Sequence, residues 1–162
     1  MASNSFCNRA KYKLFMGLCC LPLLVAQNSG HLSVGSIQKV TAKRNDKVQV
    51  KIPVTIDAGF HVNSDKPSED YLIPLKVKWT DTGALEGGTF VFPKPVSMSL
   101  AGEQKPLSVF EGSFDIVANF KVAANAPAGP GSASGKLSYQ ACNAKMCFPP
   151  KTIDIAAPYQ IN

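Results

Sequence analysis

Hydrophobic and polar residues alternate along most of the chain. In residues 47–56, KVQVKIPVTI, Val or Ile occupies every second position from Val48 to Ile56. This period of two is typical of a β-strand with one buried face. Because Pro53 has no N–H, we expect this strand to lie at a sheet edge or to be interrupted there. Similar alternation predicts further strands at 75–80, 96–100, 114–122, 137–142 and 153–155.

Segments rich in glycine, proline and small residues separate these strands. No segment after residue 26 carries apolar residues at helical spacing over the length of a helix. Seven to nine short strands with turns between them predict an all-β fold, an immunoglobulin-like antiparallel β-sandwich. The expected loops are 83–88, 93–95, 101–106 and 126–135.

The N-terminus has the composition of an export signal. Arg9, Lys11 and Lys13 precede an apolar run at 14–26, LFMGLCCLPLLVA. This run has the length of a signal-peptide core, whereas a membrane span needs about 20 residues. We therefore predict a signal peptide at 1–26, with an uncleaved anchor as the alternative. The mature domain, 27–162, is then expected to be periplasmic or otherwise exported, and to have no membrane span.

Removal of the signal peptide changes the charge and the cysteine count. The whole chain has 17 Lys and Arg residues against 11 Asp and Glu, a net charge of +6. Three basic residues leave with the signal, so the mature charge is about +3. No basic run interleaved with aromatic residues predicts nucleic-acid binding. Of five cysteines, Cys142 and Cys147 remain, and in an oxidising compartment they are expected to pair.

The two cysteines lie close together in residues 139–150, YQACNAKMCFPP. A disulfide that closes so short a loop stabilises a fold by only about 2 kcal/mol. Trp79 has no cysteine on a neighbouring strand, as an immunoglobulin-type core disulfide requires. Lys145, inside the loop, favours a thiolate. These features favour a redox-active pair over a structural bond, which stays open as an alternative.

A copper(I) site is a third interpretation of the same segment. Cys142, Met146 and Cys147 are soft ligands that suit Cu(I), and His61 is a further candidate ligand. Nothing in the sequence places His61 near the cysteines, and no Cys-rich or His-rich tract accompanies them. We therefore expect no metal and no cofactor. No other catalytic motif is present, so any enzyme activity would be thiol–disulfide interchange.

Several separate segments resemble a known family. They are GFHVNSDKPSEDYLIPLKVKW, FPKP, LSVFEG and the cysteine segment preceded by KLS. Together they are similar to the N-terminal periplasmic domain of the thiol:disulfide interchange protein DsbD, over residues 35–157. The resemblance implies an immunoglobulin-like sandwich with one catalytic disulfide. In the family, this domain receives electrons from a thioredoxin-like domain and passes them to periplasmic thiol proteins.

The resemblance also implies roles for individual residues. Cys142 and Cys147 match the redox pair, and we expect Cys147 to form the mixed disulfide with a partner. Phe60 matches an aromatic position close to the family's active site. The residues expected to line the site are Tyr139, Gln140, Phe60, Lys145 and Phe148.

The chain departs from the family pattern in three respects. The best-known members have one more residue between the cysteines. They also shield the disulfide with an aromatic cap loop, which falls at 98–105 here and contains no aromatic residue. Either the shielding is weaker in this chain, or Phe92 or Phe110 substitutes for the missing aromatic residue. Full-length members continue into membrane spans, whereas this sequence ends at Asn162. We therefore expect that a separately encoded membrane reductase reduces the domain, with thioredoxin-like redox proteins as partners; the alternative is a freestanding relay or thiol-binding adaptor. We also expect a monomer.

Overall fold

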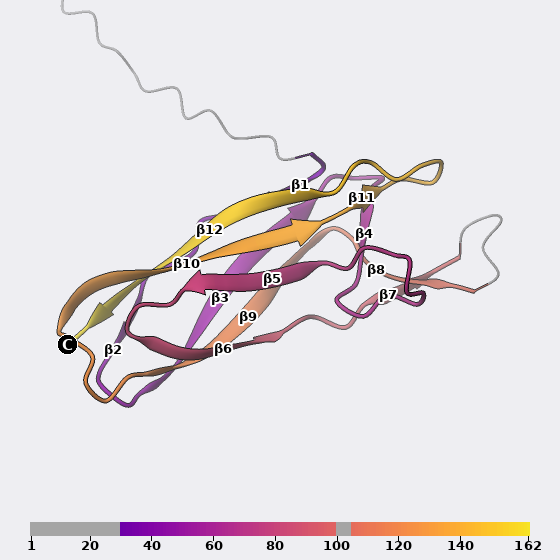
Figure 1. Cartoon of the computed structure of the whole chain (residues 1–162). Helices are drawn as coiled ribbons and strands as arrows, with labels where there is room; N and C mark the ends of the chain where they lie inside the picture. The colour runs from indigo at the N-terminus through magenta and orange to yellow at the C-terminus, as the bar shows by residue number, and fades with distance from the viewer. Residues whose placement is uncertain (1–29, 100–104) are drawn as a thin grey trace, which may run out of the picture.

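The computed structural model describes residues 30–99 and 105–162, and every regular element in these ranges is a strand (Figure 1). The predicted signal peptide at 1–26 lies outside the described residues. No helix in the described ranges is long and apolar enough to cross a membrane. The strands are β1 (Leu32–Val34), β2 (Val40–Ala42), β3 (Lys47–Ile56), β4 (His61–Asn63), β5 (Lys76–Asp81), β6 (Leu85–Val91), β7 (Val96–Met98), β8 (Leu107–Phe110), β9 (Ser113–Val122), β10 (Gly129–Tyr139), β11 (Ala141–Cys142) and β12 (Lys151–Ile161).

Two four-stranded sheets form the sandwich. One has the order β1-β3-β9-β6 and the other β2-β12-β10-β5. Their inward residues form the core, in which Ile52, Ile116 and Leu137 are fully buried. All pairings within the two sheets are antiparallel except that of β2 with β12, which is parallel. The predicted all-β, immunoglobulin-like sandwich is confirmed.

The longest predicted strand matches the structure residue by residue. In β3, the five Val and Ile residues from Val48 to Ile56 are buried, and the residues between them are exposed or half-buried. β3 pairs with β9 from Lys47 to Thr55, but with β1 only from Val54 to Ile56. The Pro53 carbonyl accepts a hydrogen bond from the Gly35 N–H at 2.8 Å, just beyond this short edge strand. Since N and O of one residue point to the same side of a strand, the missing N–H of Pro53 falls outside the β9 ladder.

Two predicted loops are strands instead. β6 covers most of 83–88, and β10 covers most of 126–135. Their glycines allow aromatic rings to pack closely against the backbone, which is a known use of glycine within strands. At Gly135, a Cβ atom would lie 2.8 Å from Cε3 of Trp79 and 2.8 Å from the carbonyl oxygen of Lys78. The glycines that suggested loops therefore allow aromatic side chains to pack closely against these strands.

A third, smaller sheet carries the cysteine segment. It has the order β11-β4-β8-β7 and lies at one end of the sandwich, away from the C-terminus (Figure 1). β11 follows directly from β10, so the cysteines begin where the long β10–β12 hairpin ends. The expected loop at 93–95 is confirmed between β6 and β7. The predicted strand at 96–100 is described as far as Ser99, and most of the expected loop at 101–106 lies outside the described residues.

Candidate functional site

Cys142 and Cys147 form a disulfide in the structure. Cys142 is the last residue of β11, and Cys147 lies in the segment that leads to β12. Their Cα atoms are 3.9 Å apart, and the two residues also form an isolated antiparallel bridge. We call residues 142–147 the cysteine loop.

Hydrogen bonds hold the cysteine loop independently of the sulfur–sulfur bond. The Asn143 side-chain oxygen accepts bonds from the backbone N–H groups of Lys145, at 2.8 Å, and Met146, at 3.0 Å. The Asn143 N–H donates to the Met146 carbonyl at 2.9 Å. Asn is well suited to such turns because its side chain can bond to nearby backbone N–H groups. None of these bonds involves a sulfur atom.

A second set of bonds closes the base of the loop. The Phe148 N–H donates to the Ala141 carbonyl at 2.8 Å. The Gln140 amide nitrogen donates to the Phe148 carbonyl at 3.0 Å. The segments that enter and leave the cysteine loop are therefore fixed to each other outside the disulfide itself.

The two cysteines differ in exposure. Cys142 is only 3% exposed, because β11 pairs with β4 in the small sheet. Cys147 is exposed. Thiol–disulfide exchange requires a sulfur that an external thiolate can reach. Of the two residues, Cys147 is therefore the one on the surface, whereas Cys142 lies inside the domain.

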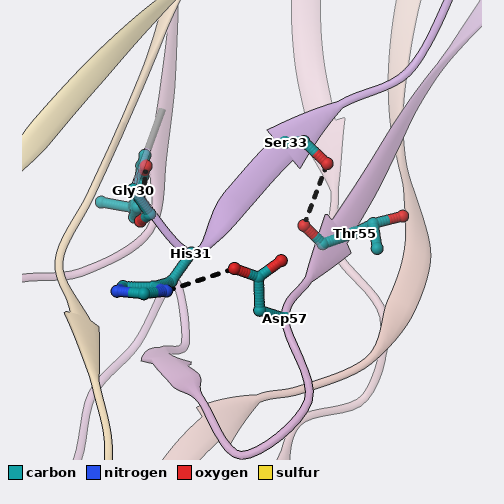
Figure 2. Close-up of polar contacts among 6 residues, drawn as sticks. Gly30, His31, Ser33, Thr55 and Asp57 are labelled. Carbon is teal, nitrogen blue, oxygen red and sulfur yellow. Dashed lines mark hydrogen bonds and ion pairs between the residues drawn. The ribbon is translucent and has the colours of Figure 1, made fainter. Parts of the chain in front are cut away.

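An aromatic cluster, formed by His31, Phe60 and Phe148, lies beside the base of the loop. The His31 and Phe60 rings stack with centroids 3.6 Å apart, and the Phe148 ring is 5.0 Å from His31 and 5.8 Å from Phe60. Nδ1 of His31 is 3.2 Å from a carboxylate oxygen of Asp57, a contact visible in Figure 2. These contacts join the start of β1, the β3–β4 turn and the exit of the cysteine loop.

Two hollows flank the cysteine loop. The larger, of about 590 Å³, is lined by Phe60, His61, Glu111 and Ala144 among others. The smaller, of about 230 Å³, is lined by His61, both cysteines, Lys145 and Met146 among others. His61 and Ala144 line both hollows, so the loop and β4 together form the wall between them.

His61 lies directly opposite Cys142. The two residues are register partners in the antiparallel pair of β4 and β11. His61 is 2% exposed, and its Nε2 atom is buried without a hydrogen-bond partner. Burial lowers the pKa of His61 below its ordinary value of 6.5, and the nearby Glu111 carboxylate opposes part of that effect. The sequence did not place His61 near the cysteines, but the strand pairing does.

The expected site residues divide into two groups. Gln140, Lys145, Phe148 and Phe60 lie on or beside the cysteine loop. Tyr139 is fully buried, and its hydroxyl donates to the Gly30 carbonyl at 3.0 Å, so it supports the neighbouring chain from within the core.

The expected substitutes for an aromatic cap lie in the sandwich core. Phe110 is 3% exposed and stacks on the half-buried Phe92, with centroids 6.2 Å apart. Neither ring lines the hollow beside the cysteines. Most of the expected cap at 98–105 lies outside the described residues, although Met98 lines the larger hollow.

Sequence reasoning missed the contribution of His31 and Asp57. His31 lies in a polar stretch near the predicted cleavage site, and Asp57 directly follows the strand predicted at 47–56. These two residues lie close together because β1 pairs with β3. β1 is too short to show an alternating pattern that would predict this pairing. Within the described residues, no group of three or more His, Cys, Asp or Glu side chains is arranged to hold a metal ion.

Comparison with solved structures shows the fold. The N-terminal periplasmic domain of ScsB from Proteus mirabilis aligns with a TM-score of 0.56 at 14% identity, over 83% of this chain. The alignment covers 48% of the ScsB chain, so this chain spans about half of that length. The reduced N-terminal domain of DsbD from Neisseria meningitidis aligns with a TM-score of 0.48 at 17% identity, over 84% of this chain and 91% of that one.

Comparison of sequences gives the family. No curated protein sequence matches the chain significantly. The family described as "Thiol:disulfide interchange protein DsbD, N-terminal" matches residues 29–158, which is most of the chain. The matched range includes both cysteines and every strand of the small sheet. The chain therefore belongs to the family of DsbD N-terminal domains.

Proposed function

We propose that this domain is an exported thiol–disulfide relay. It takes reducing equivalents from a thioredoxin-like donor and passes them to periplasmic thiol proteins through the Cys142–Cys147 pair. Membership of a thiol:disulfide interchange family supports this chemistry. The similar ScsB domain is periplasmic, which supports a periplasmic location for this domain.

The observation that carries the proposal is the unequal exposure of two bonded cysteines in a loop that other bonds maintain. Cys147 is exposed, whereas Cys142 is 3% exposed. We therefore propose that an external thiolate attacks Cys147, and the steps below follow this order. Because the Asn143 and Gln140 bonds do not involve sulfur, the loop can open and close without loss of its shape.

Reduction of the domain takes two displacements. A donor thiolate attacks Sγ of Cys147 and breaks the bond to Cys142, which leaves as a thiolate and takes up a proton. The second donor cysteine then attacks the donor sulfur of the mixed disulfide and releases Cys147 as a thiolate. The domain has gained two electrons, and the donor has become a disulfide.

Delivery to an acceptor runs in the opposite direction. The Cys147 thiolate attacks an acceptor disulfide and forms a second mixed disulfide. Deprotonated Cys142 then attacks Sγ of Cys147, which re-forms the internal bond and releases the acceptor as a dithiol. We propose that the donor is in turn reduced by a separately encoded membrane reductase, and that the domain acts as a monomer.

The test combines a potential with a trapping experiment. We expect the domain to equilibrate with a glutathione buffer, as exchange-active disulfides do, whereas structural bonds have potentials below about −300 mV. A thioredoxin-like protein that lacks its own second cysteine is first converted to a mixed disulfide with a small aromatic thiol. The Cys147 thiolate of Cys142→Ser should displace that aromatic thiol and form a stable mixed disulfide with the protein. Cys147→Ser, which keeps only the buried Cys142, is the matched control and should trap little.

The alternative is a binding module whose disulfide only shapes the loop. A potential well below about −300 mV, with no adduct to Cys142→Ser, would support that alternative and contradict the relay. Equal trapping by the two single-cysteine variants would contradict the assigned order of attack.

A further inference from the structure

His61 lies opposite Cys142, and the exchange steps described above give this histidine no role. Its backbone pairs directly with that of Cys142 across β4 and β11. Side chains at directly opposed positions of an antiparallel pair point to the same face, with Cβ atoms about 4.5–5.5 Å apart. Both side chains also line the smaller hollow. The strand pairing therefore places the imidazole of His61, a side-chain base, next to the buried Cys142.

The state of Nε2 agrees with a role in the reduced protein. In the disulfide form, this buried nitrogen has no hydrogen-bond partner. Buried polar atoms are normally paired, and an exception asks for an explanation. A disulfide sulfur has no proton to donate, but reduction gives Cys142 an S–H group. A neutral imidazole with its proton on Nδ1 has a free acceptor at Nε2.

We propose that His61 accepts the proton of the Cys142 thiol when the internal disulfide re-forms, an inference that rests on the relay function proposed above. Before the closing step, Cys147 is bonded to the acceptor and Cys142 is a thiol. The proton moves from Cys142 Sγ to His61 Nε2, and the resulting thiolate attacks Cys147 Sγ. The Cys142–Cys147 bond forms, the bond from Cys147 to the acceptor breaks, and the acceptor leaves as a thiolate. The imidazolium then releases its proton to that thiolate or to water.

The surroundings of His61 suit a base of this kind. Apart from the two cysteines, the titratable groups that line the two hollows with it are Asp57 and Glu111, in the larger, and Lys145, in the smaller. Asp57 contacts His31, which leaves Glu111 as the acidic group that acts on His61. Because burial keeps the pKa of His61 below 6.5, the imidazole is neutral near pH 7 and able to take a proton.

A two-step thiol titration measures the closing step by itself. Reduced domain reacts with a small aromatic disulfide reagent, and the first coloured thiol is released as Cys147 becomes modified. Attack by Cys142 then releases the second. In the wild-type protein, we expect the second rate to rise with pH to a plateau, with its inflection below pH 6.5.

His61→Gln should slow the second release by about 100-fold near pH 7 and remove that plateau. Its rate should instead keep rising toward the ordinary thiol pKa, near 8.5. Ser134→Ala is the control: Ser134 is exposed on β10 and lines neither hollow, so this variant should keep the wild-type profile.

Three results would overturn the inference. Equal rates and profiles in wild type and His61→Gln would show that His61 takes no proton, with the relay intact. A wild-type pH profile of the second release rate without an inflection below pH 6.5 would also show that His61 takes no proton. This measurement does not depend on the folding of any variant. Absence of the second release from the wild-type protein would instead refute the relay itself, and with it this inference.

Discussion

The Gln140 side chain donates a hydrogen bond to the Phe148 carbonyl, at 3.0 Å, and so joins the two ends of the cysteine loop. Gln140→Ala should lower the free energy of unfolding by about 1 kcal/mol, the typical net value of one such bond. The loss should be as large in the reduced protein as in the oxidised one, because the bond does not depend on sulfur. Urea denaturation of both forms measures it.

The control for this prediction is Gln160→Ala. The Gln160 amide bonds only to the adjacent Ile161 carbonyl in β12, far from the loop. If Gln140→Ala lowered the free energy of unfolding only in the reduced form, the disulfide, and not this hydrogen bond, would fix the base of the loop in the oxidised protein.

Removal of the disulfide should be well tolerated. Cys142→Ala combined with Cys147→Ala should cost about 2 kcal/mol, the chain-entropy value for so short a loop. Since the main core lies in the two large sheets, the variant should keep its strand content and cooperative unfolding. Circular dichroism and urea denaturation provide the measurement. An unfolded variant would establish a structural role for the bond.

The buried His61 makes stability depend on pH. Its pKa is below 6.5 in the folded protein and at the ordinary value when unfolded, so the unfolded state binds the proton more readily. The contribution of His61 is therefore complete above pH 6.5 and is lost as the pH falls toward the folded-state pKa. His61→Gln should reduce the slope of the unfolding free energy below pH 6.5 by at most about 1.4 kcal/mol per pH unit. An unchanged slope in this variant would contradict the assignment.

Glu111 raises the pKa of His61 against the effect of burial. Glu111→Gln should therefore shift the His61 titration to lower pH, which NMR of the imidazole ring protons detects. Because the chain has only two histidines, a His31→Gln background leaves a single resonance to follow. Asp57→Asn in the same hollow is the control and should shift this titration less.

Gly135 allows Trp79 to pack against β10. Gly135→Ala would place a Cβ atom 2.8 Å from both the Trp79 ring and the Lys78 carbonyl. Overpacking of this kind costs about 1–3 kcal/mol. The exposed neighbour Ser134 provides a control, and Ser134→Ala should change stability little. Thermal unfolding followed by the fluorescence of the single tryptophan distinguishes the two variants.

Local patterns predicted most of the fold but only part of the site. The alternation in β3 and β9 revealed the buried faces because each long strand has one face in the core. Composition misassigned residues 85–88 of β6 and 129–135 of β10 as loops, although glycines in these segments make room for aromatic rings. The cysteines were found from their spacing, but their relation to His61 depends on the pairing of β4 with β11. That pairing joins short strands far apart in the chain, and no local pattern encodes it.

The position of the cysteine loop also bears on how the family can diverge. β10 and β12 pair over eleven residues each, from Gly129 with Ile161 to Tyr139 with Lys151, and the cysteines lie entirely beyond that last pair. A residue inserted or deleted between Cys142 and Cys147 therefore changes the ring that the disulfide closes and leaves the hairpin register untouched. The size of the disulfide ring can therefore change without any change in the sandwich that carries it.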